Sequence, residues 1–525
     1  MKVSLLMHTG RSATIELNDG GIYYTREKYE VWINGKFVMT SGTVITNLFG
    51  LKPDTEYNLR VIGSESRIEA GQLWFRTKKE SFTLNVREFG AKGDGIWNDT
   101  SYIQAAILAC PEDGRVLIPK GTYRITSLFL KSRINLELAK DAVLSAVTER
   151  EQYPVFPGIV ESYDEQSELC LGTWEGNPLK MFAGILNGIG VKNIVVYGEG
   201  VIDGNASFEN WWKDAKVMKT AFRPRLLFLS GCSDVRVQGL LFTNSPSWTI
   251  HPYFSKRLTF LGSQIINPQD SPNTDGIDPE SCENVTIAGV HFSLGDDCIA
   301  LKSGKIYMGS KYKTPSSKIL IRQCLMENGH GAVTVGSEMA AGVKNVKVKE
   351  CMFLNTDRGL RVKTRRGRGK DAVLDKIVFE DIKMDHVKTP FVVNAFYFCD
   401  PDGKSFYVQS REVLPVDERT PQIKKLVFSN ISCDNCHIAG AHIQGLPERK
   451  IEHLEMRNIR MRYAPQAVSG MPAMADGIEA VSKKGIVISN VDRLILKNID
   501  IEGQEGEPFE LANVLNLEGD IKECR

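Results

Sequence analysis

A strand-like pattern that returns at short intervals is the feature of this chain that most constrains its fold. From about residue 85 onward, a polar pair leads into alternating apolar residues, then a small or polar residue, then another apolar pair. Copies that begin at Ser233, Lys256 and Glu283 start 23 and 27 residues apart. Further copies begin at Lys192, Lys318, Lys344, Lys376, Lys425 and Arg493. A short repeat built from strands, with almost no helical periodicity, predicts a solenoid.

Stacked coils of such a repeat would bury one continuous apolar core. Each coil would contribute two or three strands, and equivalent strands of neighbouring coils would lie about 4.8 Å apart. A β-propeller also repeats, but its blades usually need a unit of roughly 40 residues. We therefore predict an all-β chain in which residues 84–525 form a right-handed parallel β-helix.

The first 78 residues have a different sequence pattern from the rest of the chain. Short alternating strands are expected at Ala13–Leu17, Tyr29–Ile33, Thr43–Thr46, Tyr57–Ile62 and Leu73–Arg76. The pair Asn34-Gly35 is a strong hairpin signal. The segment Leu51–Val61 resembles the tyrosine corner of the fibronectin type III family, in which a tyrosine hydroxyl, here that of Tyr57, fixes a loop of a β-sandwich. We expect residues 1–78 to form such a small sandwich, with a structural or substrate-flanking role.

Composition narrows the classes of partner. The formal net charge is +1 with 25% charged residues, so no large field favours nucleic acid or a membrane surface. No apolar run approaches the roughly 20 residues that span a bilayer. The apolar part of Met1–His8 is too short for a secretory signal, and the 11 cysteines are scattered like buried free thiols. We expect a cytoplasmic protein, unless a signal has been removed; the oligomeric state stays open.

Four short motifs carry the chemistry. They are Asn273-Thr274-Asp275, Gly295-Asp296-Asp297, Gly329-His330-Gly331 and Arg361-Val362-Lys363. Asp275 and Asp297 are 22 residues apart, His330 follows after 33 and Arg361 after another 31, so each step is about one coil. The motifs would then project from one face of adjacent coils. Paired aspartates can divide the roles of proton donor and water activator, and the cations beside them can bind a substrate carboxylate.

These motifs, in this order, resemble those of glycoside hydrolase family 28, the polygalacturonase family, whose fold is a right-handed parallel β-helix. The resemblance covers roughly residues 84–510, and the segments Asn85–Gly95 and Ile118–Tyr123 resemble the opening segment of many pectin-active β-helices. The chain is identified as similar to bacterial exo-polygalacturonases that carry a fibronectin-like front domain. The resemblance implies cleavage of α-1,4-galacturonosidic bonds in polygalacturonate or oligogalacturonides, without a metal or other cofactor.

The same resemblance implies roles for single residues. Asp296 would donate a proton to the leaving oxygen, while Asp275 and Asp297 would hold and deprotonate the attacking water. Such a single displacement with inversion needs roughly 6.5–9.5 Å between acid and base. His330 would help to set the protonation of the acid. The predicted substrate-binding residues are Asn273, Arg361, Lys363, Tyr397 and Arg366.

The mode of cleavage is predicted from loops. Residues 146–180 and 399–422 are long enough to close one end of a groove, and the segments Thr173–Gly176 and Asn244–Pro252 look similar to bacterial exo-acting members. Both observations favour removal of units from a chain end. The alternatives are an endo-polygalacturonase and a hydrolase of branched pectin (rhamnogalacturonan or xylogalacturonan), although Gly295-Asp296-Asp297 argues against the rhamnogalacturonan branch.

Two other classes of protein share the predicted scaffold. A pectate lyase would use calcium and an arginine base in β-elimination, to which three aspartates are less suited. A non-catalytic carbohydrate-binding β-helix would need no aspartate trio. Unsaturated product, or full biological activity of an Asp296→Asn variant, would favour one or the other.

Overall fold

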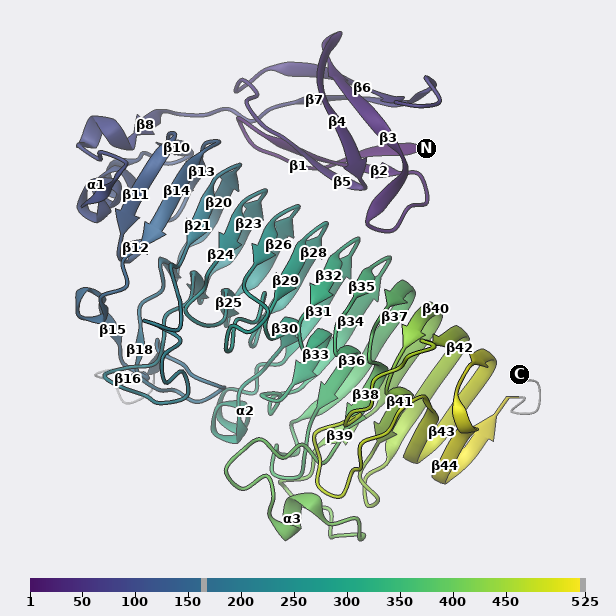
Figure 1. Cartoon of the computed structure of the whole chain (residues 1–525). Helices are drawn as coiled ribbons and strands as arrows, with labels where there is room; N and C mark the ends of the chain where they lie inside the picture. Colours follow the sequence, from purple (N-terminus) through teal and green to yellow (C-terminus); the bar gives the residue numbers. More distant parts are fainter. Residues whose placement is uncertain (162–167, 520–525) are drawn as a thin grey trace.

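The computed structural model describes residues 1–161 and 168–519, and its main body is a right-handed parallel β-helix (Figure 1). Its coils contribute strands to three rows, and equivalent strands of successive coils pair in parallel. The first row contains β8 (Thr83–Asn85), β10 (Gly114–Ile118), β13 (Ile134–Leu138), β20 (Lys192–Gly198), β23 (Ser233–Gln238), β26 (Lys256–Leu261), β28 (Glu283–Ala288), β31 (Ser316–Arg322) and β34 (Val343–Lys349).

The second row follows each of these strands after a bend. It contains β9 (Asp94–Asn98), β11 (Gly121–Ile125), β14 (Ala142–Ala146), β21 (Val201–Asp203), β24 (Leu241–Thr243), β27 (Gln264–Ile266), β29 (His291–Leu294), β32 (Leu325–Asn328) and β35 (Met352–Leu354). Toward the C-terminus, longer strands run through more than one row: β37 (Val373–Asp385), β40 (Lys425–Cys436), β42 (Ile451–Tyr463), β43 (Lys484–Glu502) and β44 (Glu505–Glu518).

The third row carries the site described below. It contains β12 (Leu128–Phe129), β19 (Leu186–Ile189), β22 (Leu227–Ser230), β25 (Ile250–Tyr253), β30 (Asp297–Leu301), β33 (Gly331–Gly336), β36 (Arg358–Lys363), β38 (Thr389–Asn394) and β41 (Ala439–Gln444). The rung of this row between β25 and β30 consists of isolated bridges: Ile277 pairs with Ile250 and Ile299, and Glu280 pairs with Tyr253 and Lys302.

Loops between the rows hold the remaining short elements. These are the helices α1 (Thr100–Ala109), α2 (Ile306–Tyr312) and α3 (Phe406–Gln409), the 3-10 turns at Val86–Phe89 and Arg150–Gln152, and the strands β15 (Val155–Phe156), β16 (Ile159–Glu161), β17 (Glu168–Cys170), β18 (Met181–Phe182) and β39 (Gln422–Ile423). Helix α1 lies at the N-terminal end of the solenoid (Figure 1). Among the described residues, no helix combines the length and apolarity that crossing a membrane would need.

Side chains of the third row that face the core lie in register on successive strands. Ile299, Val333, Leu360 and Phe391 lie in register on successive strands, and all four are fully buried. Burial of each such side chain contributes about 1.5–3 kcal/mol. The residues between them, such as Arg361 and Lys363 on β36, therefore point away from the core. The row thus presents polar side chains at fixed positions on its outer surface.

The polar pair that opens each repeat also has a structural cause. Its second residue adopts a left-handed backbone conformation, with φ of 57° at Asn193 and at Asn284 and 58° at Asp234. Asn and Asp tolerate this conformation better than most residues. The repeat visible in the sequence is therefore a repeat of backbone geometry as well as of hydrophobicity.

Residues ahead of the solenoid form a small antiparallel β-sandwich. One sheet has the order β1 (Lys2–His8), β2 (Ala13–Asn18), β5 (Ile45–Leu48), and the other has the order β4 (Lys36–Thr43), β3 (Tyr24–Ile33), β6 (Glu56–Gly63), β7 (Glu69–Arg76). The Tyr57 hydroxyl accepts a hydrogen bond from the Lys52 N–H at 2.7 Å, which is the contact expected of a tyrosine corner. The Asn34-Gly35 turn joins β3 to β4 with φ of 49° and 76°. The sequence had not indicated β1 or β4.

The sandwich lies across the first row of the solenoid (Figure 1). Met7, Val44 and Ile45 pack against Tyr197 and Leu261 in a shared apolar cluster. The domain boundaries at residues 78 and 84 stay predictions; the structure places the end of β7 at Arg76 and the start of β8 at Thr83.

Candidate active site

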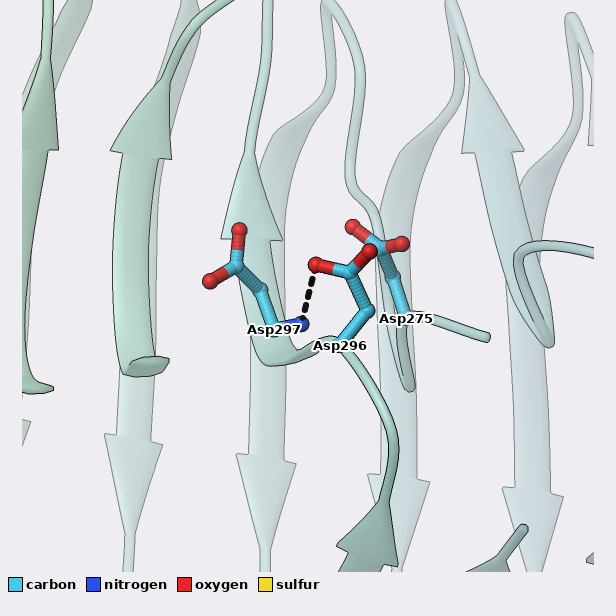
Figure 2. Close-up of side chains that lie close together, drawn as sticks. All are labelled: Asp275, Asp296 and Asp297. Atoms are coloured by element: carbon cyan, nitrogen blue, oxygen red, sulfur yellow. Dashed lines mark hydrogen bonds between the residues drawn. The ribbon is translucent and has the colours of Figure 1, made fainter. Parts of the chain in front are cut away.

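Three aspartates meet at the third row of strands. Asp296 and Asp297 stand at the start of β30, and Asp275 stands on the preceding coil, just before Ile277. Figure 2 shows the three side chains side by side, and one carboxylate oxygen of each lies within 4.8 Å of the others. The structure therefore brings together residues that are 22 positions apart in the chain.

This separation corrects one expectation from the sequence. The closest oxygens are nearer than the roughly 6.5–9.5 Å expected between an inverting acid and base. The physical reason is the scaffold, since neighbouring parallel strands lie only about 4.8 Å apart and the aspartates project from adjacent coils.

Asp297 is fully buried and paired with two cations. Its carboxylate accepts hydrogen bonds from Lys363 Nζ at 2.7 Å and from Arg361 Nη1 at 3.1 Å. Burial opposes ionisation of Asp297, but the Lys363 ammonium and the Arg361 guanidinium outweigh burial and hold the pKa of this carboxyl well below its usual range. Asp297 is therefore an anion under all ordinary conditions.

Asp275 has the opposite environment. Burial, together with the nearby carboxyls of Asp278 and Asp296, raises the pKa of Asp275 well above its usual value. The nearest cation is Lys302, whose Nζ lies 3.9 Å from Asp275 and 3.1 Å from Glu338. Neighbouring carboxyls thus differ strongly in their tendency to hold a proton, which is the condition for dividing acid and base roles.

Asp296 is the most accessible member of the trio. Its side chain is 20% exposed, and its Oδ1 accepts a hydrogen bond from the Asp297 N–H at 2.9 Å (Figure 2). His330 Nδ1 lies 3.4 Å from the same oxygen. Hydrogen bonding to Asp296 raises the pKa of His330 above 6.5. An exposed carboxyl beside a protonatable imidazole is suited to exchange protons with a ligand.

Two glycines make room for these groups. A Cβ at position 331 would lie 2.7 Å from Asp297 Oδ1 and 2.5 Å from the Thr334 hydroxyl, so only glycine leaves the carboxylate its place. Gly329 has φ of 83°, and a Cβ there would meet the Asp296 carbonyl at 2.5 Å. The glycines of the third motif are therefore required by the position of the aspartates.

The predicted polar ligands occupy the same site. Asn273, with φ of 56°, accepts a hydrogen bond on Oδ1 from Arg223 Nη2 at 2.7 Å. Tyr397 is nearly buried, and Lys363 Nζ lies 5.8 Å from the centre of its ring. Both Asn273 and Tyr397 line the cavity above the aspartates.

Arg366 is the exception, and its predicted role in substrate binding is wrong. The side chain is 1% exposed, does not line the cavity, and is bound by Glu448 at 2.6 and 2.8 Å and by the Ser410 carbonyl at 2.7 Å. These contacts fix the loop around α3 to the solenoid. An arginine that is saturated by buried partners has no donors left for a substrate carboxylate.

Asp275 and Asp296 line a cavity of about 780 Å³, and the fully buried Asp297 lies next to them. Its walls come from three separate loops: Trp174–Leu179 on one side, Cys399–Pro401 on another, and Met474 above Arg361. Arg361 Nη2 lies 2.8 Å from Met474 Sδ, and Asn394 Nδ2 donates to the Met474 carbonyl at 3.0 Å. The first two walls were expected from loop length, whereas the wall at Met474 was not.

Aromatic stacking fixes the first wall to the solenoid. Trp174 stacks on Phe222 with ring centroids 4.5 Å apart and 6° between the planes. The buried Arg225 guanidinium lies 5.0 Å from the Trp174 ring and 4.8 Å from the Trp248 ring. The wall is therefore a packed structure and not a loose loop.

Sequence reasoning also missed the cations deeper in the cavity. Lys302 is fully buried and lies 4.1 Å from the centre of the Trp248 ring, and Lys305 lies 3.1 Å from Asp400. Lys302 stands two rungs before Lys363 on the row, since Lys302 follows Leu301 of β30. A lone lysine that ends an apolar strand was the available signal.

The aspartate trio has the donor set of a cation site, because one oxygen of each carboxylate converges on the same space. Lys363, Arg361 and Lys302 already supply positive charge to these carboxylates. A bound divalent cation would compete with them, so the arrangement favours protein cations over a metal ion.

Comparisons with known proteins place the chain among pectin-active families. Residues 171–469 match the family Glycosyl hydrolases family 28, and residues 83–143 match the family Rhamnogalacturonase A/epimerase, pectate lyase-like. A probable polygalacturonase of Vitis vinifera is 28% identical over 412 residues, which cover 76% of this chain and 78% of that protein. An endo-polygalacturonase of Pectobacterium carotovorum subsp. carotovorum is 28% identical over 313 residues, 57% of this chain and 72% of that protein.

Among solved structures, the family 28 exopolygalacturonase of Yersinia enterocolitica has a similar fold. The TM-score is 0.71 with 20% sequence identity, and the alignment covers 99% of this chain and 98% of that one. The similarity extends over the sandwich as well as the solenoid.

Proposed function

This chain belongs to glycosyl hydrolases family 28, and from that membership we propose that it hydrolyses α-1,4-galacturonosidic bonds and acts from a chain end. The substrates are oligogalacturonides or polygalacturonate. The observation that carries the proposal is the cavity itself, in which carboxylates and cations on the floor are enclosed by walls from three loops. A cavity closed at one end accepts a chain terminus, whereas an endo-acting enzyme needs a groove open at both ends.

Charge supports an acidic sugar as the substrate. Arg358, Arg361, Lys363, Lys302 and Lys305 all line the cavity. Arg361 and Lys363 share their donors between Asp297 and the open space above it, because a guanidinium and an ammonium each carry several N–H groups. A galacturonate carboxylate would receive hydrogen bonds from these donors.

Asp296 acts as the proton donor in this proposal. It is the most exposed of the three carboxyls, and His330 beside it can return a proton after each turnover. Protonation of the glycosidic oxygen by Asp296 breaks the bond to the anomeric carbon, and the leaving sugar departs with the proton.

Asp297 and Asp275 hold the attacking water, and the ionised Asp297 accepts its proton. Asp297 stays ionised because of its two cations. Arg361 binds one of its carboxylate oxygens and Lys363 binds the other, and these bonds hold Asp297 back from a covalent bond to the sugar. We therefore retain inversion of the anomeric configuration, although the carboxylates are closer together than in most inverting enzymes. Proton NMR of the first product formed tests this step, and a product of retained configuration would contradict it.

A time course on polygalacturonic acid in the presence of EDTA tests the main proposal. Reducing ends, viscosity, ultraviolet absorbance and the products would be followed together. Galacturonate or a short dimer as the sole early product, with little loss of viscosity, is the expected result. A rapid fall in viscosity would identify an endo-polygalacturonase, and ultraviolet-absorbing product would identify a lyase. Without turnover of this polymer, branched pectins would be tested next.

A further inference from the structure

The wall of the cavity carries an unusual residue at its tip, Glu175. The Trp174 N–H donates to the Asn177 carbonyl at 3.0 Å, and the Asn177 N–H donates to the Trp174 carbonyl at 3.0 Å, so Glu175 and Gly176 form a two-residue hairpin turn. Their φ values are 45° and 73°, which is the left-handed pair of a type I′ turn. Asn or Gly usually occupies the first of these positions, because the left-handed conformation disfavours longer side chains.

Contacts on both sides hold this strained turn in place. The Lys305 N–H donates to the Gly176 carbonyl at 3.0 Å. A Cβ at position 176 would lie 2.7 Å from the Lys305 nitrogen and 2.8 Å from Glu338 Cγ, so the turn is pressed against the solenoid. Since Trp174 is itself stacked on Phe222, the backbone of the turn at Glu175 is held from both sides.

Glu175 adds a carboxylate to a cavity whose lining carries both acidic and basic side chains. Its side chain is 48% exposed, and its Oε2 lies 3.8 Å from Lys305 Nζ, which is too long for a strong hydrogen bond. Lys305 is closer to Asp400, at 3.1 Å. A carboxylate with free acceptor oxygens would repel a galacturonate carboxylate, but it accepts hydrogen bonds from sugar hydroxyls.

The position of Glu175 indicates which sugar it faces. Lys302 contacts both Glu338, which packs against the turn, and Asp275: its Nζ lies 3.1 Å from Glu338 and 3.9 Å from Asp275. The charge of Glu338 in turn contributes to the raised pKa of Glu175, after burial as the main cause. The proton donor Asp296 is paired instead with His330, at 3.4 Å. Because Lys302 contacts Asp275, one of the two carboxyls that hold the attacking water, we assign the sugar near Lys302 and Glu175 as the one attacked by water.

We propose that Glu175 accepts a hydrogen bond from the 4-hydroxyl of the non-reducing terminal galacturonate. Within a chain this oxygen carries the next sugar and has no proton to donate, so Glu175 distinguishes a chain end from an internal residue. The inference rests on the proposed exo-hydrolysis and adds the group that recognises the end.

The test compares two trimers on the wild-type protein and on Glu175→Gln. One is trigalacturonate, whose terminal ring has the 4-hydroxyl; the other is its 4-deoxy-4,5-unsaturated analogue, which lacks it. We expect the wild-type kcat/KM to favour the saturated trimer by about 100-fold. In Glu175→Gln the saturated trimer should slow by about 10-fold while the unsaturated one changes little, because only the first offers the hydroxyl. Equal slowing of both trimers by the substitution would overturn the proposal.

A second variant separates recognition from folding. Glu175→Gly removes the side chain and also relieves the left-handed backbone, so its Tm should not fall, while its preference for the saturated trimer should be lost. Glu209→Gln, an exposed glutamate outside the cavity, is the matched control and should behave as wild type. A Tm well below that of wild type in Glu175→Gly would assign the residue to the fold and overturn the proposal.

Two further substrates keep this proposal distinct from the proposed function. The first is trigalacturonate whose reducing end has been chemically reduced. Glu175→Gln should slow it as much as it slows the unreduced trimer. If the substitution had no effect on the reduced trimer, Glu175 would contact the reducing end and the assignment would be overturned. Internal cleavage of long polymer by the wild-type protein would contradict exo action itself, whatever the trimers show.

Discussion

Two surfaces of the same solenoid bury polar groups in different ways. On the first row, Gln238 is fully buried under the sandwich, where its Oε1 accepts from the Ser12 hydroxyl at 2.7 Å and its Nε2 donates to the Thr14 hydroxyl at 2.8 Å. On the third row, Asp297 is equally buried but is an anion matched by Lys363 and Arg361. The buried polar group of the first row thus has neutral hydrogen-bond partners, whereas that of the third row has charged partners.

The difference has a physical cause. A neutral hydrogen bond that is fully paired leaves nothing to titrate and little to offer a ligand. A buried charge stays stable only while its partners remain, and it changes the pKa values of its neighbours. We therefore expect substitutions on the third row to affect activity or pH dependence, and substitutions on the first row to affect stability alone.

Asp296→Asn should produce the largest effect. It removes the proposed proton donor but keeps the shape of the side chain, so turnover of oligogalacturonides should fall by roughly 10³- to 10⁴-fold. Thermal unfolding should stay close to that of wild type. Steady-state kinetics with a calorimetric Tm measure both quantities. Substantial wild-type rate in this variant would remove Asp296 from its role.

Lys363→Met should damage both activity and stability. It leaves the buried Asp297 with one cation instead of two, and we expect the free energy of unfolding to fall by about 3 kcal/mol. The double variant Asp297→Asn/Lys363→Met should recover part of this stability but no activity. Urea unfolding measures the change. The control is Lys370→Met, which breaks an exposed pair with Glu418 and should cost less than about 1 kcal/mol; equal losses in the two variants would contradict the argument.

Glu280→Gln tests whether Glu280, which pairs with His251 on the third row, is uncharged in the folded protein. Burial, with the charge of Glu338, raises the pKa of Glu280 to about 8, and burial lowers the pKa of His251, whose Nε2 lies 2.9 Å from Glu280. Because the folded pKa is raised, the contribution of Glu280 to stability is full below about pH 4.5 and is lost as the pH rises to about 8.

Gln stays neutral, so between pH 5 and 8 the variant should gain stability relative to wild type, by roughly 2 kcal/mol or more. Unfolding curves at several pH values measure this difference. Glu327→Gln, in a partly exposed His–Glu pair, is the control for the substitution itself and should change stability by less than about 1 kcal/mol. If the difference in stability between Glu280→Gln and wild type did not change with pH, Glu280 would be ionised in the folded protein.

Gln238→Ala should have the smallest effect, and it should be confined to stability. Loss of the amide leaves buried hydroxyls of the sandwich with fewer partners, at a cost of about 1–2 kcal/mol. Activity should be unchanged, because the cavity lies on a different row of strands. Gln72→Ala, at an exposed position of the sandwich, serves as the control. A drop in kcat with Gln238→Ala would mean that the two surfaces are coupled.

Much of the fold could be predicted from the sequence, because it depends on local rules. Alternation of apolar residues determines which side chains face the core, and the polar pair at the start of each repeat marks a left-handed residue such as Asn193 or Asn284. Tyr57 and the Asn34-Gly35 turn also have local signatures, and both contacts are present in the sandwich. The edge strands β1 and β4 were missed, since edge strands need less regular alternation.

For the candidate site, the sequence predicted which aspartates lie together but not every cation that joins them. Motif spacing of one coil was enough to bring Asp275, Asp296 and Asp297 together. Arg366 and Lys363 look alike in the sequence, yet Arg366 is bound to Glu448 and Lys363 to Asp297. The partner of a long cationic side chain is selected by whichever carboxylate the fold brings near, and Glu448 is 82 residues away.

The sequence by itself determined the repeat, the two kinds of domain and the order of the four motifs, because hydrophobic period and backbone preference are properties of neighbouring residues. Only the tertiary structure decided the short separation of the aspartates, the opposite pKa shifts of Asp275 and Asp297, and the wall at Met474. Those features depend on strand spacing, burial and contacts between loops far apart in the chain, and distance along the sequence carries no information about them.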